Sequence, residues 1–128
     1  MATIKSYTDI EQSKKLAEFL PLESADMYWS IEEVPFLAFP VNDIVTDWKY
    51  AEENGMLPAW SLAALLGVLP IIGEEKDAAN PFIAKTPAGE YYVVYATLYK
   101  EIDSSGIYNN PVDACVEMII KLHEQNIL

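Results

Sequence analysis

The sequence contains no arginine and few positive charges of any kind. Its 8 basic residues, all lysines, stand against 20 acidic residues, so the 128-residue chain has a formal net charge of −12. Proteins that bind nucleic acid directly neutralise phosphates with clustered Lys and Arg, and they read guanine with the bidentate Arg side chain. The composition therefore argues against direct binding of nucleic acid.

Cysteine and histidine occur once each, as Cys115 and His123, and there are only 5 glycines. One cysteine cannot form an intrachain disulfide or anchor a cysteine-rich zinc site. Cys115 and His123 would stand about 12 Å apart along a helix, too far for a nucleophile and its base. The sequence also lacks a glycine-rich phosphate loop, a G-x-S-x-G elbow, H-E-x-x-H and C-x-x-C. We therefore expect no enzyme, no catalytic residue, no metal site and no cofactor.

Long apolar runs are missing too. The uncharged stretch from Asn54 to Gly73 is broken by glycines and prolines, and its helical part, Ala59 to Leu69, would reach only about 16 Å. A bilayer core needs about 30 Å. The first residues also lack the apolar run of a secretory signal. These features predict a cytoplasmic protein without a membrane span.

Hydrophobic residues make up 52% of the chain, which predicts a packed core, and the length favours one globular domain over residues 1–128. A first helix is expected from Asp9 to Leu20. The spacing of Thr8 and Glu11 predicts its capping box, with Thr8 as the N-cap. A last helix is expected to begin after Asn110 as its N-cap and to run to the end of the chain.

The segment from Pro58 to Leu69 predicts a helix that starts at Pro58 or is capped by Ser61. Its leucines form one apolar stripe, which we expect to face the core. A second stripe consists mostly of small residues and permits close approach of another backbone. Another layer of the same chain is the favoured cover, and a homodimer is the alternative. The small-residue stripe consists of Trp60, Ala63, Ala64 and Gly67.

Residues 82–99 predict a β-hairpin, with Pro87 and Gly89 in its turn. The segment from Val34 to Pro40 is expected to supply an edge strand at best, because of its prolines. The fold class is therefore α+β: a short antiparallel sheet packed against two to three helices.

Alternation along the strand from Tyr91 to Tyr99 puts its odd-numbered tyrosines on one face and Tyr92, Val94, Ala96 and Leu98 on the other. We expect the second face to lie in the core and the tyrosine face to be half exposed. Exposed tyrosines are typical of contact surfaces, although β-propensity alone also enriches them. The predicted interaction surface consists of Tyr91, Tyr95, Tyr99, Trp60, Asp26 and Trp29.

Three long phrases of the chain resemble an uncharacterised family of small acidic proteins from prophages and mobile elements of gut anaerobic bacteria. The phrases are YTDIEQSKKLAEFLPLESADMYW, PAWSLAALL with a following LP, and NPVDACVEMIIKLHEQ. Residues 73–86 are not part of this resemblance. It implies an accessory role in a phage or mobile element, and it carries no assigned activity and no catalytic residue.

These observations favour a non-enzymatic module that binds an unknown protein partner through an acidic and aromatic surface. The segment from Glu23 to Glu53 contains eight acidic residues and a single basic one, Lys49. An acidic DNA mimic that inhibits a nucleic-acid-binding protein is therefore the first alternative. It requires carboxylates ordered at the spacing of phosphates. The second alternative is a small carboxylate-based hydrolase with a pocket near Trp29, Trp48 and Trp60, which would hold a carboxylate of raised pKa.

Overall fold

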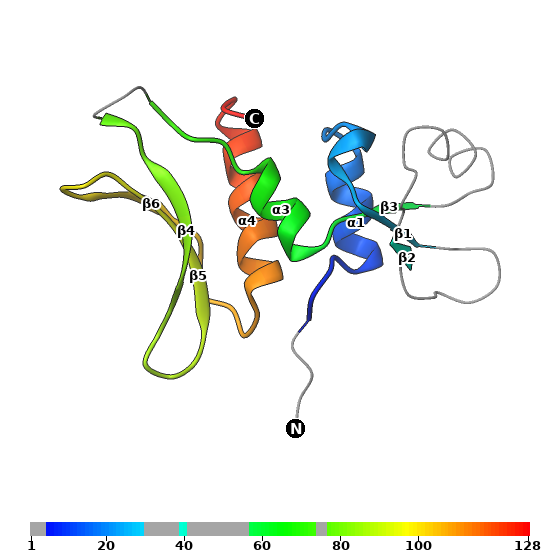
Figure 1. Ribbon diagram of the computed structural model, residues 1–128, viewed down its shortest axis with the longest axis horizontal. Helices are drawn as coiled ribbons and strands as arrows, with labels where there is room; N and C mark the ends of the chain where they lie inside the picture. Colours follow the sequence, from blue (N-terminus) through cyan, green and yellow to red (C-terminus); the bar gives the residue numbers. More distant parts are fainter. Residues whose placement is uncertain (1–4, 30–38, 41–56, 74–76) are drawn as a thin grey trace. The chain divides into compact units, whose positions relative to one another are not determined.

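The computed structural model describes residues 5–29, 39–40, 57–73 and 77–128. These residues form an α+β fold with three α-helices, one short 3₁₀ helix and two three-stranded antiparallel sheets (Figure 1). They divide into two compact units, Ser6–Leu65 and Leu66–Leu128, the second of which includes Lys5. Each unit is described by itself below, and the single domain expected from the length stays a prediction.

The first helix, α1 (Ile10–Ala17), begins one residue later than its capping box predicted. Asp9, not Thr8, is the N-cap: its carboxylate accepts a hydrogen bond from the Gln12 N–H at 2.8 Å, and the Gln12 side chain accepts one from the Asp9 N–H at 3.1 Å. Thr8 is fully buried, and its hydroxyl is committed to tertiary partners. The local pattern fits either register, and the tertiary partners select the later one.

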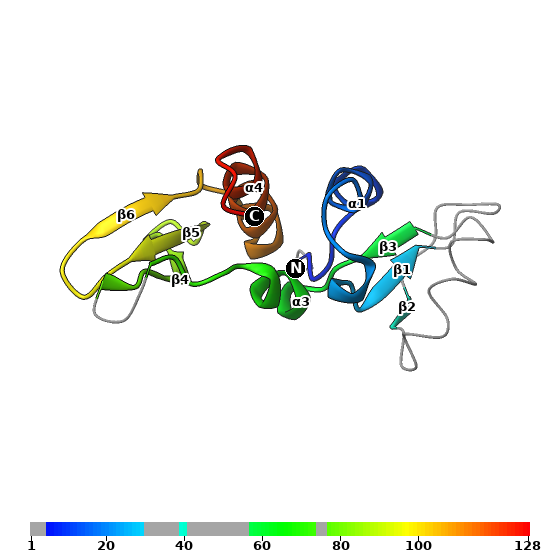
Figure 2. The same cartoon turned by 90° about the horizontal axis from the view of Figure 1, so that it is seen from above.

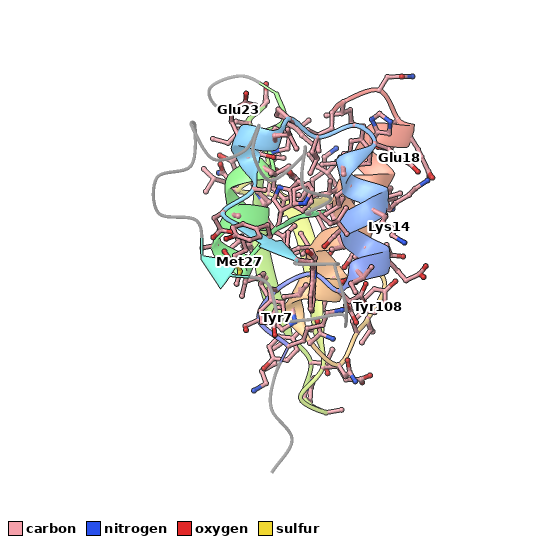
Figure 3. All side chains as sticks on the ribbon, turned by 90° about the vertical axis from the view of Figure 1, so that its right-hand side faces the viewer. Tyr7, Lys14, Glu18, Glu23, Met27 and Tyr108 are labelled. Atoms are coloured by element: carbon pink, nitrogen blue, oxygen red, sulfur yellow. The ribbon has the colours of Figure 1, made fainter. Side chains whose placement is uncertain are left out.

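The faces of α1 agree with its apolar spacing. Leu16 is buried on the helix and Leu20 just beyond it, while Lys14 and Glu18 are exposed and project away from the helix (Figure 3). The buried side of α1 packs against strand β3 (Figure 2). The prediction of an amphipathic first helix is therefore confirmed.

A 3₁₀ helix, η1 (Leu22–Ser24), follows Pro21 and leads into strand β1 (Met27–Trp29). β1 is the central strand of a sheet in the order β2-β1-β3, flanked by β2 (Phe39–Pro40) and β3 (Leu57–Ala59). The end of the expected edge strand thus lies at a sheet edge, and residues 34–38 lie outside the described residues.

The helix expected within residues 58–69 is α3 (Leu62–Val68). It starts at Ser61, whose hydroxyl accepts a hydrogen bond from the Ala64 N–H at 3.1 Å. Pro58 and Ala59 instead belong to β3, where they pair with Tyr28 and Met27 of β1. Pairing with a strand 30 residues earlier in the sequence therefore overrides the helical start at Pro58.

The two stripes of α3 are not both covered. Of the helix residues themselves only Leu65 is buried, and Leu69 is buried just beyond the helix. Leu66, which was expected in the core, is 40% exposed. Ala63 and Gly67 of the small-residue stripe are exposed as well, whereas Trp60 precedes the helix and is fully buried. The expectation that the chain itself covers the small-residue stripe is not met by the described residues.

The second unit contains the predicted hairpin as β4 (Asn80–Lys85) and β5 (Tyr91–Ala96), followed by β6 (Glu101–Ser104). Gly89 has a φ of 85° in the hairpin turn, as a glycine there permits. A register shift opposite Tyr95 and Ala96 leaves Ile102 unpaired at a β-bulge. The third strand was not predicted, because residues 103–106, which overlap the end of β6, have the composition of a turn.

Helix α4 (Pro111–Glu124) packs against β5 of this sheet. Its start is as predicted, since the Asn110 side chain accepts a hydrogen bond from the Asp113 N–H at 2.8 Å and Pro111 occupies the first turn. The buried positions of the helix follow its apolar spacing. They are Pro111, Val112, Ala114, Cys115, Val116, Met118, Ile119 and Leu122.

The faces of β5 differ from the prediction. Val93 and Tyr95, which were expected to be half exposed, are 0% exposed to solvent. Val94, on the opposite face, is also buried, at 3% exposed. Leu98, which was expected in the core, lies beyond the strand and is 89% exposed. Both faces of β5 are apolar, so alternation alone does not tell which one the helix covers.

None of the helices in the described residues combines the length and the apolar character needed to cross a bilayer.

Candidate interaction surface

Three of the six residues predicted to form an interaction surface lie in the core. Trp60 and Tyr95 are 0% exposed and Trp29 is 8% exposed. Burial also raises the pKa of the Tyr95 hydroxyl to about 12, and this hydroxyl donates a hydrogen bond to the Pro70 carbonyl at 2.7 Å. The folded chain therefore does not present these three side chains to a partner.

The two buried tryptophans are tied into the fold through Thr8. The Trp29 Nε1–H donates to the Thr8 carbonyl at 3.1 Å, and the backbone N–H of Trp60 donates to Thr8 Oγ1 at 3.1 Å. The Thr8 hydroxyl also contacts the buried Ser13 hydroxyl at 2.7 Å. Trp60 Nε1–H donates to Ser24 Oγ at 3.0 Å. Their polar groups are satisfied inside the protein, so these residues serve the core.

This result bears on the hydrolase hypothesis. Two of the three tryptophans that were expected to line its pocket are buried with their N–H groups bonded, and Trp48 lies outside the described residues. No set of three His, Cys, Asp or Glu side chains in the described ranges is arranged to hold a metal ion. The hydrolase therefore stays a prediction without a described pocket.

Asp26 joins strand β1 to the start of α3. Its Oδ1 accepts a hydrogen bond from the Ser61 N–H at 2.9 Å, and its Oδ2 accepts a short one from the Ser61 hydroxyl. Ser61 in turn caps the first turn of α3. Asp26 was predicted as part of the interaction surface, but its carboxylate is engaged with Ser61 inside the fold. Asp26 acts on the cap indirectly, by holding Ser61.

The acidic segment is described only in part. Of its eight carboxylates, Glu23 is exposed on η1 and Asp26 is engaged with Ser61, whereas the other six lie outside the described residues. The order of carboxylates that the DNA-mimic hypothesis requires is therefore a prediction that lies outside the described residues.

Cys115 and His123 lie apart on α4. Cys115 is fully buried, and burial raises the pKa of its thiol to about 12, so the thiol is protonated at neutral pH and unreactive. His123 is exposed in the last turn, where its Nδ1 lies 3.1 Å from the carbonyl oxygen of Leu128. As the spacing predicted, the two do not form a nucleophile and base.

Tyr91 and Tyr99, the remaining predicted surface residues, lie near opposite ends of the β5 segment. Tyr91 is half-buried beside the first hairpin turn, where the Lys85 Nζ lies 5.5 Å from its ring centroid. Tyr99 lies in the turn between β5 and β6 and is 90% exposed. Of the predicted set, Tyr99 is thus the side chain most available to a partner.

Three further exposed apolar residues lie toward the end of the sheet at which Tyr99 is found. Phe82 on β4 pairs with Val94, the unpaired Ile102 lies at the bulge of β6, and the turn follows Ala96 of the strand between them. With strands about 5 Å apart, these residues occupy one end of the sheet. We call this group the sheet-end patch; its members, with their exposed fractions, are Phe82 (49%), Leu98 (89%), Tyr99 (90%) and Ile102 (49%).

The turn that carries Leu98 and Tyr99 is held by Thr97. Thr97 Oγ1 accepts hydrogen bonds from the backbone N–H groups of Tyr99 and Lys100, both at 3.2 Å. The Thr97 N–H donates to the Lys100 carbonyl at 2.9 Å. The turn projects from the end of the sheet on the side away from α4 (Figures 1 and 2). Sequence reasoning missed Leu98, because it continued the strand through a Thr-centred turn.

A surface ion pair joins α4 to β6 in the same unit. Lys121 Nζ lies 2.6 Å from Asp103 Oδ1 and donates to the Ser104 carbonyl at 3.1 Å. The pKa of Asp103 lies below its usual range, mainly because Lys121 donates a hydrogen bond to the carboxylate. Burial raises this pKa, and the hydrogen bond from the Ser104 N–H lowers it further. Asp103 is thus held in its charged form.

This ion pair predicts a pH-dependent contribution to stability. Because the pKa of Asp103 is lower in the folded chain, its contribution is complete above the unfolded value of about 4 and is lost as the pH falls through the folded value. Asp103→Asn should therefore lower the free energy of unfolding by about 0.5–1 kcal/mol at pH 7, and by less as the pH falls toward 3. Urea denaturation over this range measures it. Glu124→Gln, at an exposed carboxylate of α4, is the control, and an equal loss at both ends of the range would contradict the prediction.

Comparison with known proteins adds no relationship. No protein-family model, curated protein sequence or solved structure shows significant similarity to the chain. The functional argument therefore takes no support from these comparisons.

Proposed function

We propose that this protein is a non-enzymatic interaction module that binds a protein partner through the sheet-end patch. The observation that carries the proposal is the pair Leu98 and Tyr99, which are 89% and 90% exposed on one turn. Large exposed apolar groups on a monomer are typical of binding surfaces. The resemblance to prophage and mobile-element proteins supports an accessory role of this kind in the cytoplasm of a bacterial host.

The energetics of the patch fit such a role. Full burial of a leucine or a similar side chain is worth about 1.5–3 kcal/mol, so the two turn residues alone offer several kcal/mol to a partner. The Thr97 hydrogen bonds hold the backbone of the turn, which reduces the entropy lost on binding. The thiol of Cys115 is buried, the two tryptophan N–H groups are bonded and Asp26 is engaged with Ser61, so these particular groups serve the fold.

The test compares immobilised wild-type chain with the double variant Leu98→Ser/Tyr99→Ser in affinity capture from a bacterial host extract. We expect the double variant to capture about tenfold less of a partner protein than the wild type does, since each 1.4 kcal/mol of binding free energy corresponds to a factor of ten. Quantitative mass spectrometry at low and moderate salt provides the measurement, and circular dichroism checks that both proteins are folded.

Ile107→Ser is the matched control, because Ile107 is 57% exposed on the same unit but lies outside the sheet-end patch. It should retain the captured protein. The proposal fails if the double variant captures the same proteins in the same amounts as the wild type. A partner whose retention falls steeply with salt and does not depend on Leu98 would instead favour the DNA-mimic hypothesis.

A further inference from the structure

The residues that follow the apolar pair carry opposite charges. Lys100 and Glu101 come directly after Leu98 and Tyr99, and both are exposed. Neither forms an ion pair with another residue in the part of the chain that the structure describes. The turn therefore presents an apolar pair and, immediately beside it, one positive and one negative side chain.

The turn itself carries balanced charge in an otherwise acidic chain, whereas the exposed Asp77 precedes β4 toward the same end of the sheet. The formal net charge is −12, so most surfaces of two copies repel each other. At the turn, Lys100 stands next to Glu101, and on β6 the carboxylate of Asp103 is paired with Lys121 at 2.6 Å. Two copies that meet turn to turn therefore bring side chains of both signs to the point of contact.

The order of the four residues is also self-complementary. A two-fold contact between identical chains requires that residue i of one copy meets residue j of the other, and that j meets i. Two turns related in this way bring Leu98 and Tyr99 of both copies together. Lys100 of each copy then lies opposite Glu101 of the second copy, which gives two ion pairs for one apolar contact.

We propose that the partner that occupies the sheet-end patch is a second copy of this chain, held by Leu98 and Tyr99 and aligned by reciprocal Lys100–Glu101 pairs. The inference rests on the proposed function, because it names the partner of the same surface. It differs from the homodimer through the small-residue stripe, of which Trp60 is buried.

Sedimentation equilibrium of the full chain over a wide range of concentrations tests the proposal. We expect a reversible monomer–dimer equilibrium, with the dimer favoured by added salt because salt screens the net repulsion between two acidic chains. Leu98→Ser should leave the chain monomeric. Ile107→Ser, at an exposed apolar position outside the patch, should dimerise as the wild type does.

A charge swap separates a specific two-fold contact from general stickiness. Lys100→Glu and Glu101→Lys should each weaken the dimer about tenfold, since each removes two symmetry-related pairs and creates two repulsions. The double variant Lys100→Glu/Glu101→Lys restores the pairs with reversed sign and should recover most of the wild-type affinity.

The inference is overturned if the wild-type chain is monomeric at all concentrations, or if the double swap is as weak as the single variants. Its failure is distinguishable from failure of the proposed function. A monomeric chain that still captures a host protein in a Leu98-dependent way retains the function and loses only the second copy. A dimer that is insensitive to Leu98→Ser would place the self-contact on another surface and reject the inference, while the capture experiment alone decides the proposed function.

Discussion

Replacing Trp60 by alanine is expected to lower the free energy of unfolding by about 3–5 kcal/mol. Trp60 is 0% exposed and is the largest fully buried side chain among the residues that the structure describes. Its removal leaves a cavity and also deprives the Ser24 hydroxyl of the indole N–H that bonds it at 3.0 Å. Domains of this size are stable by only about 5–15 kcal/mol, so the loss is a large part of the total.

Urea denaturation followed by far-ultraviolet circular dichroism gives the measurement. Trp60→Phe serves as the second variant, since it keeps an aromatic ring in the core and loses mainly the hydrogen bond to Ser24, with an expected cost of about 1–3 kcal/mol. If Trp60→Ala costs less than Trp60→Phe, or leaves stability unchanged, then Trp60 is not the core residue that its burial indicates.

Replacing Asp26 by alanine is expected to lower the free energy of unfolding by about 2 kcal/mol. The carboxylate accepts hydrogen bonds from both the N–H and the hydroxyl of Ser61, and bonds to charged groups contribute about 1.5–3 kcal/mol each when buried. Asp26 and Ser61 are only partly buried, so water offsets part of the loss. The effect should appear as a loss of helix, because Ser61 caps α3.

Asp26→Asn separates charge from geometry. Asparagine keeps one acceptor oxygen and should lose roughly half as much stability as alanine, while Glu23→Ala, three residues earlier and exposed, should have almost no effect. The free energies come from the same urea denaturation. Equal losses for Asp26→Ala and Glu23→Ala would show that the carboxylate does not hold the start of α3.

Local patterns in the sequence predicted several parts of the fold correctly. The α+β class, the amphipathic α1, the β4–β5 hairpin with its glycine turn, and the Asn110 cap of α4 all follow from signals within a few residues. Each depends on contacts between near neighbours in the chain, such as caps, turns and apolar spacing.

The candidate surface was predicted less well. The sequence pointed to Tyr99, but it also selected Trp29, Trp60 and Tyr95, which the structure buries, and it assigned Leu98 to the core. Aromatic residues have the same β-propensity whether they are buried or exposed, so composition alone does not separate the two. The Thr97 hydroxyl holds the turn by accepting hydrogen bonds from the following N–H groups. In a sequence, however, a threonine is only a weak indicator of such a turn.

By itself, the sequence determined the charge, the scarcity of reactive groups and the local elements, because these depend on composition and on neighbouring residues. Only the tertiary structure decided the cap at Asp9 over Thr8, the strand at Pro58, the covered face of β5 and the exposure of Leu98. The reason is that each depends on a partner distant in the sequence. Thr8 is withdrawn from capping by Trp60, 52 residues away, and Pro58 is drawn into a strand by Tyr28.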